Sequence, residues 1–366
     1  MIRLKNIMKK TNFKKTYTLP FKFKVANTAK NILKKNTYPS SKIKFIKRYW
    51  FLKIKHQSSL EVDEILLNHH KILWINISAP SLGDSLMDLS SRGMLCNKHL
   101  DLFTSKKNAE IYLNDAIFSS VFTKAHEIEE SNYDLVILDS YSTRSVQIKV
   151  DVAPKVNFVG MFGFYNGPEV NRVLFSFHRM NSLLGYIKSE NEINLMAKTQ
   201  LNISDSDKEV IESYNLPTYF VAIVVGGEWD FRTFNKWALV VEKLFNLDKG
   251  LKIILIGSKN GIDMANSIIN KNSKVSILNF VAKLSFIQTA EVINQAKYVI
   301  SCDGGLMHVA NAVNTPLVLL LARLDKSMML TKSNNSFTLF DISDVNNIPV
   351  ERVIDKCREA SNKLRK

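Results

Sequence analysis

The sequence predicts an α/β protein with two parallel-sheet domains and a basic N-terminal extension. Three observations lead to this fold class. The chain has 366 residues, enough for two domains of ordinary size, and 46% of them are apolar, which suffices for two cores. Short apolar runs alternate with helical patterns, as in proteins whose parallel strands are joined by helices. The positive charge is concentrated at one end of the chain.

The predicted extension, residues 1–70, is where this charge lies. Its first 60 residues contain 15 Lys and 2 Arg but no Asp or Glu, so they account for the net charge of +16, and the rest of the chain is close to neutral. Lysines interleaved with aromatic residues favour an anionic membrane surface, at about 1 kcal/mol per engaged basic residue. The alternatives are a tail without a specific role and an organelle transit peptide, although transit peptides are rich in Arg.

The composition argues against several other classes of protein. The near-neutral remainder and the lack of a zinc-finger, RNP-like or helix-turn-helix pattern argue against a nucleic-acid role. No apolar run approaches the roughly 18 residues of a membrane span, and no signal peptide is visible. Three cysteines, at positions 96, 302 and 357, have no metal-ligand spacing and form no disulfide framework. We therefore expect no metal site and a reducing, cytoplasmic location.

The N-terminal domain is predicted at residues 71–190. Its opening strand is the apolar run Ile72–Ile77, and a loop that ends in Gly83-Asp84 leads into a helix. By residue type alone, Asp84 could simply cap that helix. It also lies in a loop at the carboxyl end of a parallel strand, which is where α/β proteins bind their ligands.

A polar stretch without a strong strand signal predicts a linker at 191–215, and the second domain follows at 216–345. One of its strands ends at Gly226-Gly227, and Ile253–Gly257 is another strand that ends in glycine. The last segment, 346–366, is amphipathic and predicts a C-terminal helix. Its apolar stripe comprises Val353, Ile354, Cys357, Ala360 and Leu364.

The most informative stretch is Tyr298–Leu321, which has the pattern of a strand, a turn, a short helix, a second turn and a strand. Asp303-Gly304-Gly305 follows the first strand, and we expect positive φ angles there and bare N–H groups at the start of the helix. Such an amide-lined, positively polarised pocket at the carboxyl end of a parallel strand suits a diphosphate. On spacing alone, a tight turn without a ligand is the alternative.

This stretch resembles the donor-site signature of the heptosyltransferase family, D-[ST]-G-x-x-H-x-A-A-x-x-x-P, with departures at Gly304 and Asn311. The turn at Gly83-Asp84 is similar to the family's G-D-[VI]-[LI] turn, but Ser78 stands where a basic residue is usual. Further similarities follow in the family's order over most of residues 71–340. They are Tyr133–Asp139, Phe177–Arg179, Val224–Gly227, Lys236-Trp237 and Phe280–Ala296.

The resemblance implies a GT-B fold, in which two Rossmann-like domains face a central cleft and the last helix often crosses back onto the first domain. It implies an acceptor domain at 71–190 and a nucleotide-sugar donor domain at 216–345. Asp84 would be the catalytic base, and Arg144 and His178 would contact the acceptor. The donor-binding residues would be Gly226, Gly227, Arg232, Lys236, Gly257, Asp303, Gly304, Gly305 and His308.

The function that follows is inverting transfer of a sugar, a heptose by resemblance, from a nucleotide-diphosphate donor such as ADP-heptose. The acceptor would be a lipopolysaccharide core or another lipid-linked surface glycan, and the reaction would need neither a metal nor a cofactor. Residues 1–60 would hold the enzyme at the inner face of the membrane. The alternatives are another nucleotide-sugar transferase acting on a surface glycan, and a non-catalytic membrane- or partner-binding protein on a degenerate GT-B fold.

Overall fold

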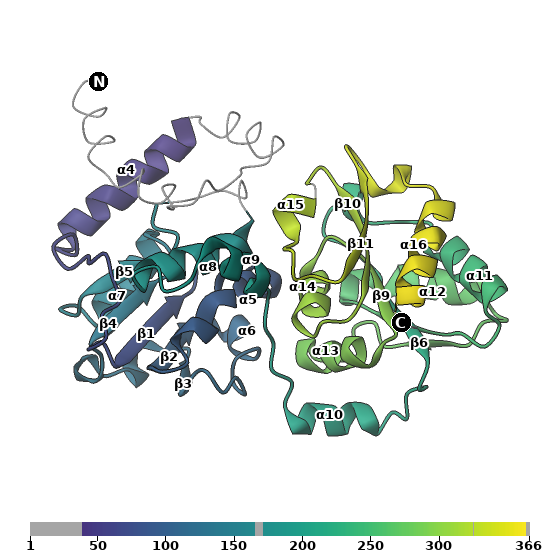
Figure 1. The fold of residues 1–366 in the computed structure, drawn as a ribbon, viewed down its shortest axis with the longest axis horizontal. Coiled ribbons are helices and arrows are strands. Elements are labelled where there is room, and N and C mark those ends of the chain that lie inside the picture. The colour runs from purple at the N-terminus through teal and green to yellow at the C-terminus, as the bar shows by residue number, and fades with distance from the viewer. Residues whose placement is uncertain (1–38, 165–170, 325, 364–366) are drawn as a thin grey trace. The chain divides into compact units, whose positions relative to one another are not determined.

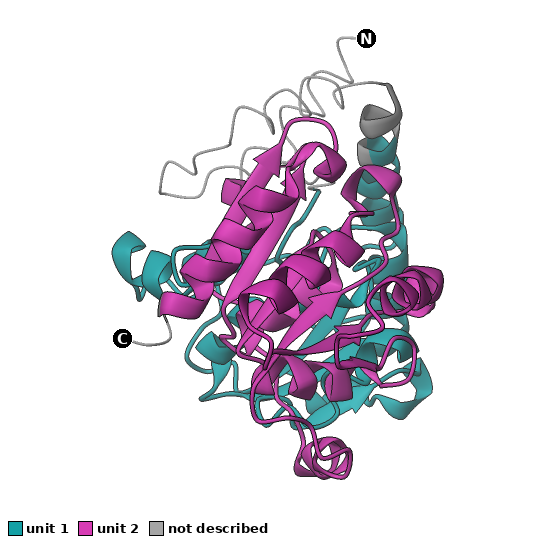
Figure 2. Cartoon of the chain, turned by 90° about the vertical axis from the view of Figure 1, so that its right-hand side faces the viewer, with its two compact units in different colours: residues 1–197, 331–333 teal, residues 198–330, 334–366 magenta. Residues whose placement is uncertain are grey.

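The chain forms two compact units, each with its own parallel sheet and buried core (Figures 1 and 2). The computed structural model describes residues 39–164, 171–324 and 326–363. Unit 1 consists of residues 1–197 with 331–333, and unit 2 of residues 198–330 with 334–366. The chain therefore passes from one unit to the other after residue 197, where the sequence predicts a linker at 191–215.

The sheet of unit 1 has five parallel strands in the order β3-β2-β1-β4-β5. Since β1 and β4 lie side by side at the centre, the loops that follow them diverge from the switch point of the sheet. Strand β1 is buried after its first residue, because helices cover both faces of a parallel sheet. The strands are β1 Lys71–Asn76, β2 His99–Thr104, β3 Ser120–Phe122, β4 Leu135–Leu138 and β5 Phe158–Gly160.

Short helices connect and cover these strands (Figure 1). Several begin at a side-chain cap, as α7 does at Ser142 and α8 at Asn171, where the cap oxygen accepts a backbone N–H of the first turn. The helices are α4 Pro39–Ile54, α5 Leu82–Asp88, α6 Lys106–Ala109, α7 Thr143–Val152, α8 Arg172–Leu183 and α9 Glu190–Met196. The 3₁₀ turns are η1 Ser90–Leu95, η2 Ala125–Glu127 and η3 Glu130–Asn132.

Helix α4 lies N-terminal to the predicted domain start at residue 71, yet it packs within unit 1 against α7 (Figure 1). Leu52 is buried in the same apolar cluster as Val146 of α7. After the helix, the backbone N–H of Val62 donates to the carbonyl of Phe158 in β5, which ties this segment to the edge of the sheet. The part of the extension from α4 onward is therefore folded onto unit 1, while residues 1–38 lie outside the described residues.

The sheet of unit 2 has six parallel strands in the order β11-β10-β9-β6-β7-β8, with β9 and β6 at its switch point. The strands are β6 Phe220–Val224, β7 Lys252–Ile256, β8 Ile277–Asn279, β9 Tyr298–Cys302, β10 Leu317–Ala322 and β11 Ser336–Asp341. The helices are α10 Asp205–Glu212, α11 Trp237–Leu247, α12 Ile262–Lys271, α13 Phe286–Gln295, α14 Gly305–Ala312, α15 Lys326–Met329 and α16 Val350–Lys363. The 3₁₀ turns are η4 Asp230–Arg232, η5 Lys259–Gly261 and η6 Val345–Asn347.

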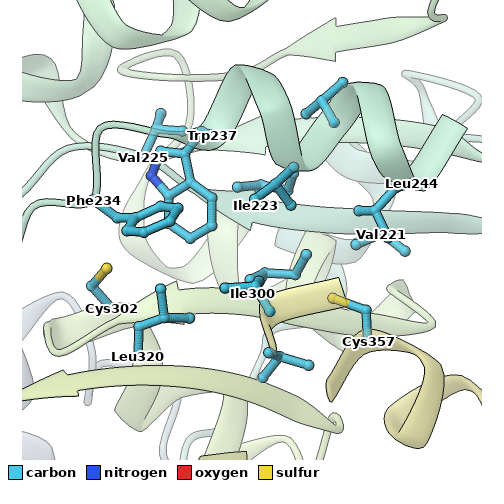
Figure 3. Packing of buried hydrophobic residues seen from close by; sticks show 14 of the residues in the cluster. Val221, Ile223, Val225, Phe234, Trp237, Leu244, Ile300, Cys302, Leu320 and Cys357 are labelled. Atoms are coloured by element: carbon cyan, nitrogen blue, oxygen red, sulfur yellow. The ribbon is translucent and has the colours of Figure 1, made fainter. Parts of the chain in front are cut away.

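One large apolar cluster forms the core of unit 2 on one side of this sheet (Figure 3). Trp237 stands edge-on to Phe234, with ring centroids 4.8 Å apart, and both are buried beside Cys302. Burial raises the pKa of the Cys302 thiol to about 12, so it stays protonated and behaves as a small apolar group.

Helix α16 belongs to unit 2. It packs onto α11, β10 and β11. The physical reason is its apolar stripe, which joins the core of unit 2: Cys357 is buried there opposite Ile300 and Val221 (Figure 3). Four members of the predicted stripe are buried as expected, and Leu364 lies outside the described residues. In the part of the chain that the structure describes, no helix is long and apolar enough to cross a membrane.

Candidate active site

Asp84 occupies the third position of α5, just beyond the carboxyl end of β1. Ser81 caps this helix: its Oγ accepts the N–H of Asp84 at 3.2 Å and donates to Asp84 Oδ2 at 2.6 Å. The sequence left open that Asp84 is itself the cap, and the structure gives that role to Ser81. The Asp84 side chain is 22% exposed, so its carboxylate is held in place but remains accessible.

Arg172, the first residue of α8, joins Asp84 to a second carboxylate. Its Nη1 donates to Asp84 Oδ1 at 2.8 Å, and its Nε and Nη2 donate to Asp88 at 2.9 and 2.6 Å. The guanidinium also lies 5.6 Å from the ring centre of Phe162. Burial raises the pKa of Asp88 to about 6, although the charge of Arg172 opposes that shift. An arginine held by the buried Asp88 thus fixes the orientation of Asp84.

A second polar cluster fills the switch point of unit 1, between the ends of β1 and β4. Asp139 is buried, and its carboxylate accepts the backbone N–H groups of Ile77 at 2.8 Å and of Ser78 at 2.6 Å. Burial raises the pKa of Asp139, and these hydrogen bonds act against the shift. The hydroxyl of Ser78 lies within hydrogen-bonding distance of three other seryl hydroxyls, those of Ser140, Ser142 and Ser145.

The two predicted acceptor residues lie in different surroundings within unit 1. Arg144 is exposed at the start of α7, and its guanidinium donates to the carbonyl of Ile77, so it stands at the carboxyl edge of the sheet near Ser78. His178 lies on the inner side of α8 with only 3% of its surface exposed. Burial lowers the pKa of His178, and the nearby charge of Glu190 opposes that shift. An acceptor would therefore reach Arg144 far more readily than His178.

In unit 2 an ion pair lies at the switch point between β6 and β9. Arg232, at the end of η4, donates from Nη1 to Asp303 Oδ2 at 3.0 Å, and its Nη2 lies 3.4 Å from Glu228. Asp303 directly follows β9, and its side chain is 8% exposed. The pair places a guanidinium next to the loop that begins α14.

The backbone of that loop differs from the expectation of positive φ angles. Gly304 has φ 174° and ψ 178°, an extended conformation that any residue adopts, and Gly305 is not among the glycines with positive φ. A Cβ placed on Gly304 would meet no atom within 4 Å. Gly304 is also the N-cap of α14 and supplies no side-chain acceptor for the first turn. Its lack of a side chain therefore leaves open space in front of the helix N-terminus.

The other predicted glycines have a packing role. Gly226 has φ +89°, and a Cβ there would lie 2.8 Å from Asn260 Oδ1 and 2.9 Å from the Cα of Gly261. A Cβ on Gly227 would collide with Thr233, and one on Gly257 with the carbonyl of Val225. These glycines let the loops after β6 and β7 approach each other closely.

Lys236 and His308 complete the predicted donor residues. Lys236 precedes α11, and its Nζ donates to the carbonyl of Asn346 in η6 at 2.5 Å. His308 faces the interior from α14, with 3% of its surface exposed, and its carbonyl accepts the hydroxyl of Thr199 at 2.8 Å. Lys236 therefore stabilises the packing of two loops in unit 2, and His308 is a buried residue of the first turn of α14.

Three residues of these edges were missed by sequence reasoning. Arg172 and Asp88 were missed because they lie 84 residues apart in the chain and only the fold joins them. Arg323 immediately follows β10, and its guanidinium lies 3.7 Å from the ring centre of Phe231, the neighbour of Arg232. The rule that ligands bind at the carboxyl ends of parallel strands could have identified Arg323. Among the described residues, no group of three His, Cys, Asp or Glu is placed to hold a metal ion.

The comparisons with known proteins agree with this architecture. Residues 167–337 match the model of glycosyltransferase family 9 (heptosyltransferase). The fold is similar to that of a glycosyl transferase family 9 protein from Veillonella parvula, with a TM-score of 0.69 and 14% identity over 82% of this chain and 99% of that one. No curated protein matches the chain by sequence.

Two Escherichia coli structures are also similar. One is the ADP-heptose lps heptosyltransferase II, with a TM-score of 0.66 and 17% identity over 81% of this chain and 100% of that one. The other is heptosyltransferase WaaC with ADP-2-deoxy-2-fluoro heptose, with a TM-score of 0.58 and 19% identity over 79% of this chain and 99% of that one. At these identities the structures establish the fold.

Two Rossmann-like units with parallel sheets define the class: this is an α/β protein of GT-B fold, as the sequence predicted. The resemblance to the heptosyltransferases is confirmed by the match to family 9 over residues 167–337. The chain thus resembles the heptosyltransferases, and nearly half of it matches a glycosyltransferase family.

Proposed function

We propose that this protein transfers a heptose, with inversion, from an ADP-heptose-like donor to a lipopolysaccharide core or another surface glycan. The observation that carries the proposal is the edge of unit 2. There the N-terminus of α14 faces open space at Gly304, and Arg232 is held beside it by Asp303. Backbone N–H groups and a guanidinium suit a diphosphate. In support, the similar WaaC structure holds an ADP-linked fluoro-heptose.

Asp84 is the proposed general base. As the acceptor hydroxyl attacks the anomeric carbon, Asp84 takes its proton, and the bond from that carbon to the diphosphate oxygen breaks. The nucleotide diphosphate leaves with the electron pair of that bond. Arg232 and the N–H groups of α14 stabilise the developing negative charge, and Arg323 is a third candidate for this role because it lies at the same edge. The proposed reaction needs no metal ion.

The proposed setting is the cytoplasmic face of a membrane that carries a lipid-linked acceptor. The basic N-terminal 60 residues supply an attraction to anionic lipid, and the nearly neutral remainder gives little reason to bind nucleic acid. Of the two predicted acceptor residues, Arg144 is the better placed to meet an anionic acceptor, since it is exposed at the edge of unit 1.

The deciding experiment incubates the full chain with ADP-heptose and a lipopolysaccharide-core acceptor and measures release of ADP. We expect turnover that EDTA does not reduce. A panel of nucleotide diphosphates should raise the melting temperature only when the base suits the site, because a ligand that binds the native state stabilises it by mass action. No release with any nucleotide sugar, while ADP still raises the melting temperature, would favour the non-catalytic alternative. Equal release of ADP with and without acceptor would indicate hydrolysis instead of transfer.

A further inference from the structure

Helix α4 has two faces of different character. Its inner face joins the core of unit 1, where Leu52 is buried and Ile46 and Tyr49 are half-buried. Its outer face carries five exposed side chains, which at 3.6 residues per turn spread over about half of the helix circumference. They are Lys44, Lys47, Trp50, Lys53 and Ile54.

The outer face is positively charged, and no acidic residue of the same helix neutralises it. The segment Pro39–Ile54 contains no acidic residue, and Asp and Glu are absent from the first 60 residues of the chain. The one arginine of the helix, Arg48, turns inward and donates to the carbonyl of Phe164 at 3.4 Å. The outer charges are therefore all lysine ammonium groups. Lysine acts as a point charge, whereas the forked guanidinium of arginine is the group that recognises nucleic-acid bases and phosphates most specifically.

Two large apolar side chains lie among these lysines. Trp50 is 49% exposed and stands edge-on to Tyr49, with ring centroids 5.9 Å apart, and Ile54 is 68% exposed. Indole rings favour the boundary between lipid headgroups and acyl chains. Lysine side chains extend their apolar stems along such a boundary while the ammonium stays at the phosphates.

We propose that the outer face of α4 is the surface by which this protein binds an anionic lipid bilayer. The lysines contact lipid phosphates, and Trp50 and Ile54 enter the headgroup layer. The contact is shallow, because the apolar side of α4 is already used in the core of unit 1. This inference rests on the proposed membrane location and assigns it to a folded helix of unit 1, and it does not depend on the transfer reaction.

The test is co-sedimentation of the full chain with vesicles of phosphatidylcholine, with and without phosphatidylglycerol, in about 0.15 M salt. A triple variant, K44E/K47E/K53E, should lower partitioning to anionic vesicles by about 100-fold. A matched control, K106E/K107E/K155E, makes the same change of charge at exposed positions elsewhere on unit 1 and should leave partitioning close to wild type. Equal losses in the two variants would overturn the α4 surface and leave only a net-charge effect.

Tryptophan fluorescence gives a second readout in the same samples. Trp50 and Trp229 are exposed, whereas Trp74 and Trp237 are buried. Anionic vesicles should shift the emission to the blue and allow quenching by brominated lipid, and Trp50→Phe should abolish both effects while Trp229→Phe keeps them. Effects that persist in Trp50→Phe and disappear in Trp229→Phe would overturn the inference. If the wild-type chain ignores vesicles or prefers RNA at the same salt, the proposed membrane location fails as well.

Discussion

The two sheets share a parallel topology but differ at their carboxyl edges. In unit 1 the chain fills its own edge: Asp139 accepts backbone N–H groups at the switch point, and Arg172 joins Asp84 to Asp88. In unit 2 the corresponding loop presents Gly304, which has no side chain and has open space where a Cβ would stand. A base must be held in one orientation before it reacts, while a phosphate needs donors that the protein leaves unused. We call the edge of unit 1 the rigid edge and that of unit 2 the open edge; the proposed function assigns the base to the first and the donor to the second.

The largest effect is expected when the Asp84 carboxylate of the rigid edge is neutralised. Asp84→Asn keeps the size of the side chain but removes the proton acceptor, so turnover should fall by about 10²-fold or more. Donor affinity, measured by calorimetry with ADP, should stay at the wild-type value because the proposed donor residues lie in unit 2. Turnover close to wild type would remove Asp84 from the role of base.

A change at Arg172, which binds the Asp84 carboxylate, should lower turnover less. Arg172→Lys keeps the positive charge but loses the fork that contacts Asp84 and Asp88 together, so turnover should fall by about 10-fold. The loss should appear in kcat while ADP affinity and the melting temperature change little. If turnover of Arg172→Lys matches wild type, Arg172 has no positioning role.

The open edge makes a prediction about Gly304. Gly304→Val should fill the space in front of α14 and lower ADP affinity by about 10-fold, or about 1.4 kcal/mol, without loss of stability, since its backbone is extended. Gly304→Ser should bind ADP at least as well as wild type. Gly226→Ala is the structural contrast, because its φ of +89° and close contacts predict a loss of about 1–3 kcal/mol in the free energy of unfolding. A destabilised Gly304→Val with normal ADP affinity would contradict the open edge.

The raised pKa of Asp88, a buried carboxylate of the rigid edge, should make the stability of the protein depend on pH. The pKa of Asp88 is raised to about 6 in the folded protein, against about 3.9 when unfolded, so the native state binds more protons than the unfolded state between these values. The contribution of Asp88 to the free energy of unfolding therefore falls as pH rises from about 4 to about 6, and is constant above. Urea unfolding of wild type and Asp88→Asn across this range should give a difference that changes with pH only there. A constant difference would show that the pKa is not raised.

The smallest effect concerns the backbone of unit 2 outside the site. Ala282 has φ +62°, in the left-handed region that disfavours residues with a Cβ. Ala282→Gly should therefore raise the free energy of unfolding by up to about 1 kcal/mol. Ala238→Gly, in helix α11, is the control and should lower it by about 1 kcal/mol. Equal losses in both variants would mean that the strain at Ala282 is negligible.

Local patterns predicted the strands well because each strand is a short apolar run. The run Ile72–Ile77 contains most of β1, and Ile253–Gly257 contains most of β7. The helix expected after the Asp303-Gly304-Gly305 turn is present and begins at Gly305. These features depend on a few neighbouring residues, so the sequence alone determines them.

What the sequence did not predict depends on residues far apart. The Arg172 side chain meets two carboxylates that precede it by 84 and 88 residues. The stripe of α16 was visible, but its partner was not, because several apolar surfaces compete for one helix. One miss was local: the predicted positive φ at Gly304 was wrong, because a Gly-Gly pair allows positive φ without requiring it.

Lys149 of α7 joins this helix to Gln57 in the segment after α4. Its Nζ donates to Gln57 Oε1 at 2.6 Å and lies 5.4 Å from the ring centre of Phe158, and burial lowers its pKa to about 8. This amine therefore loses its proton at a lower pH than an ordinary surface lysine does. The fold thus covers a reactive amine with Gln57. Because Lys149 is fully buried, an acylating reagent reaches this amine only when the contact with Gln57 opens.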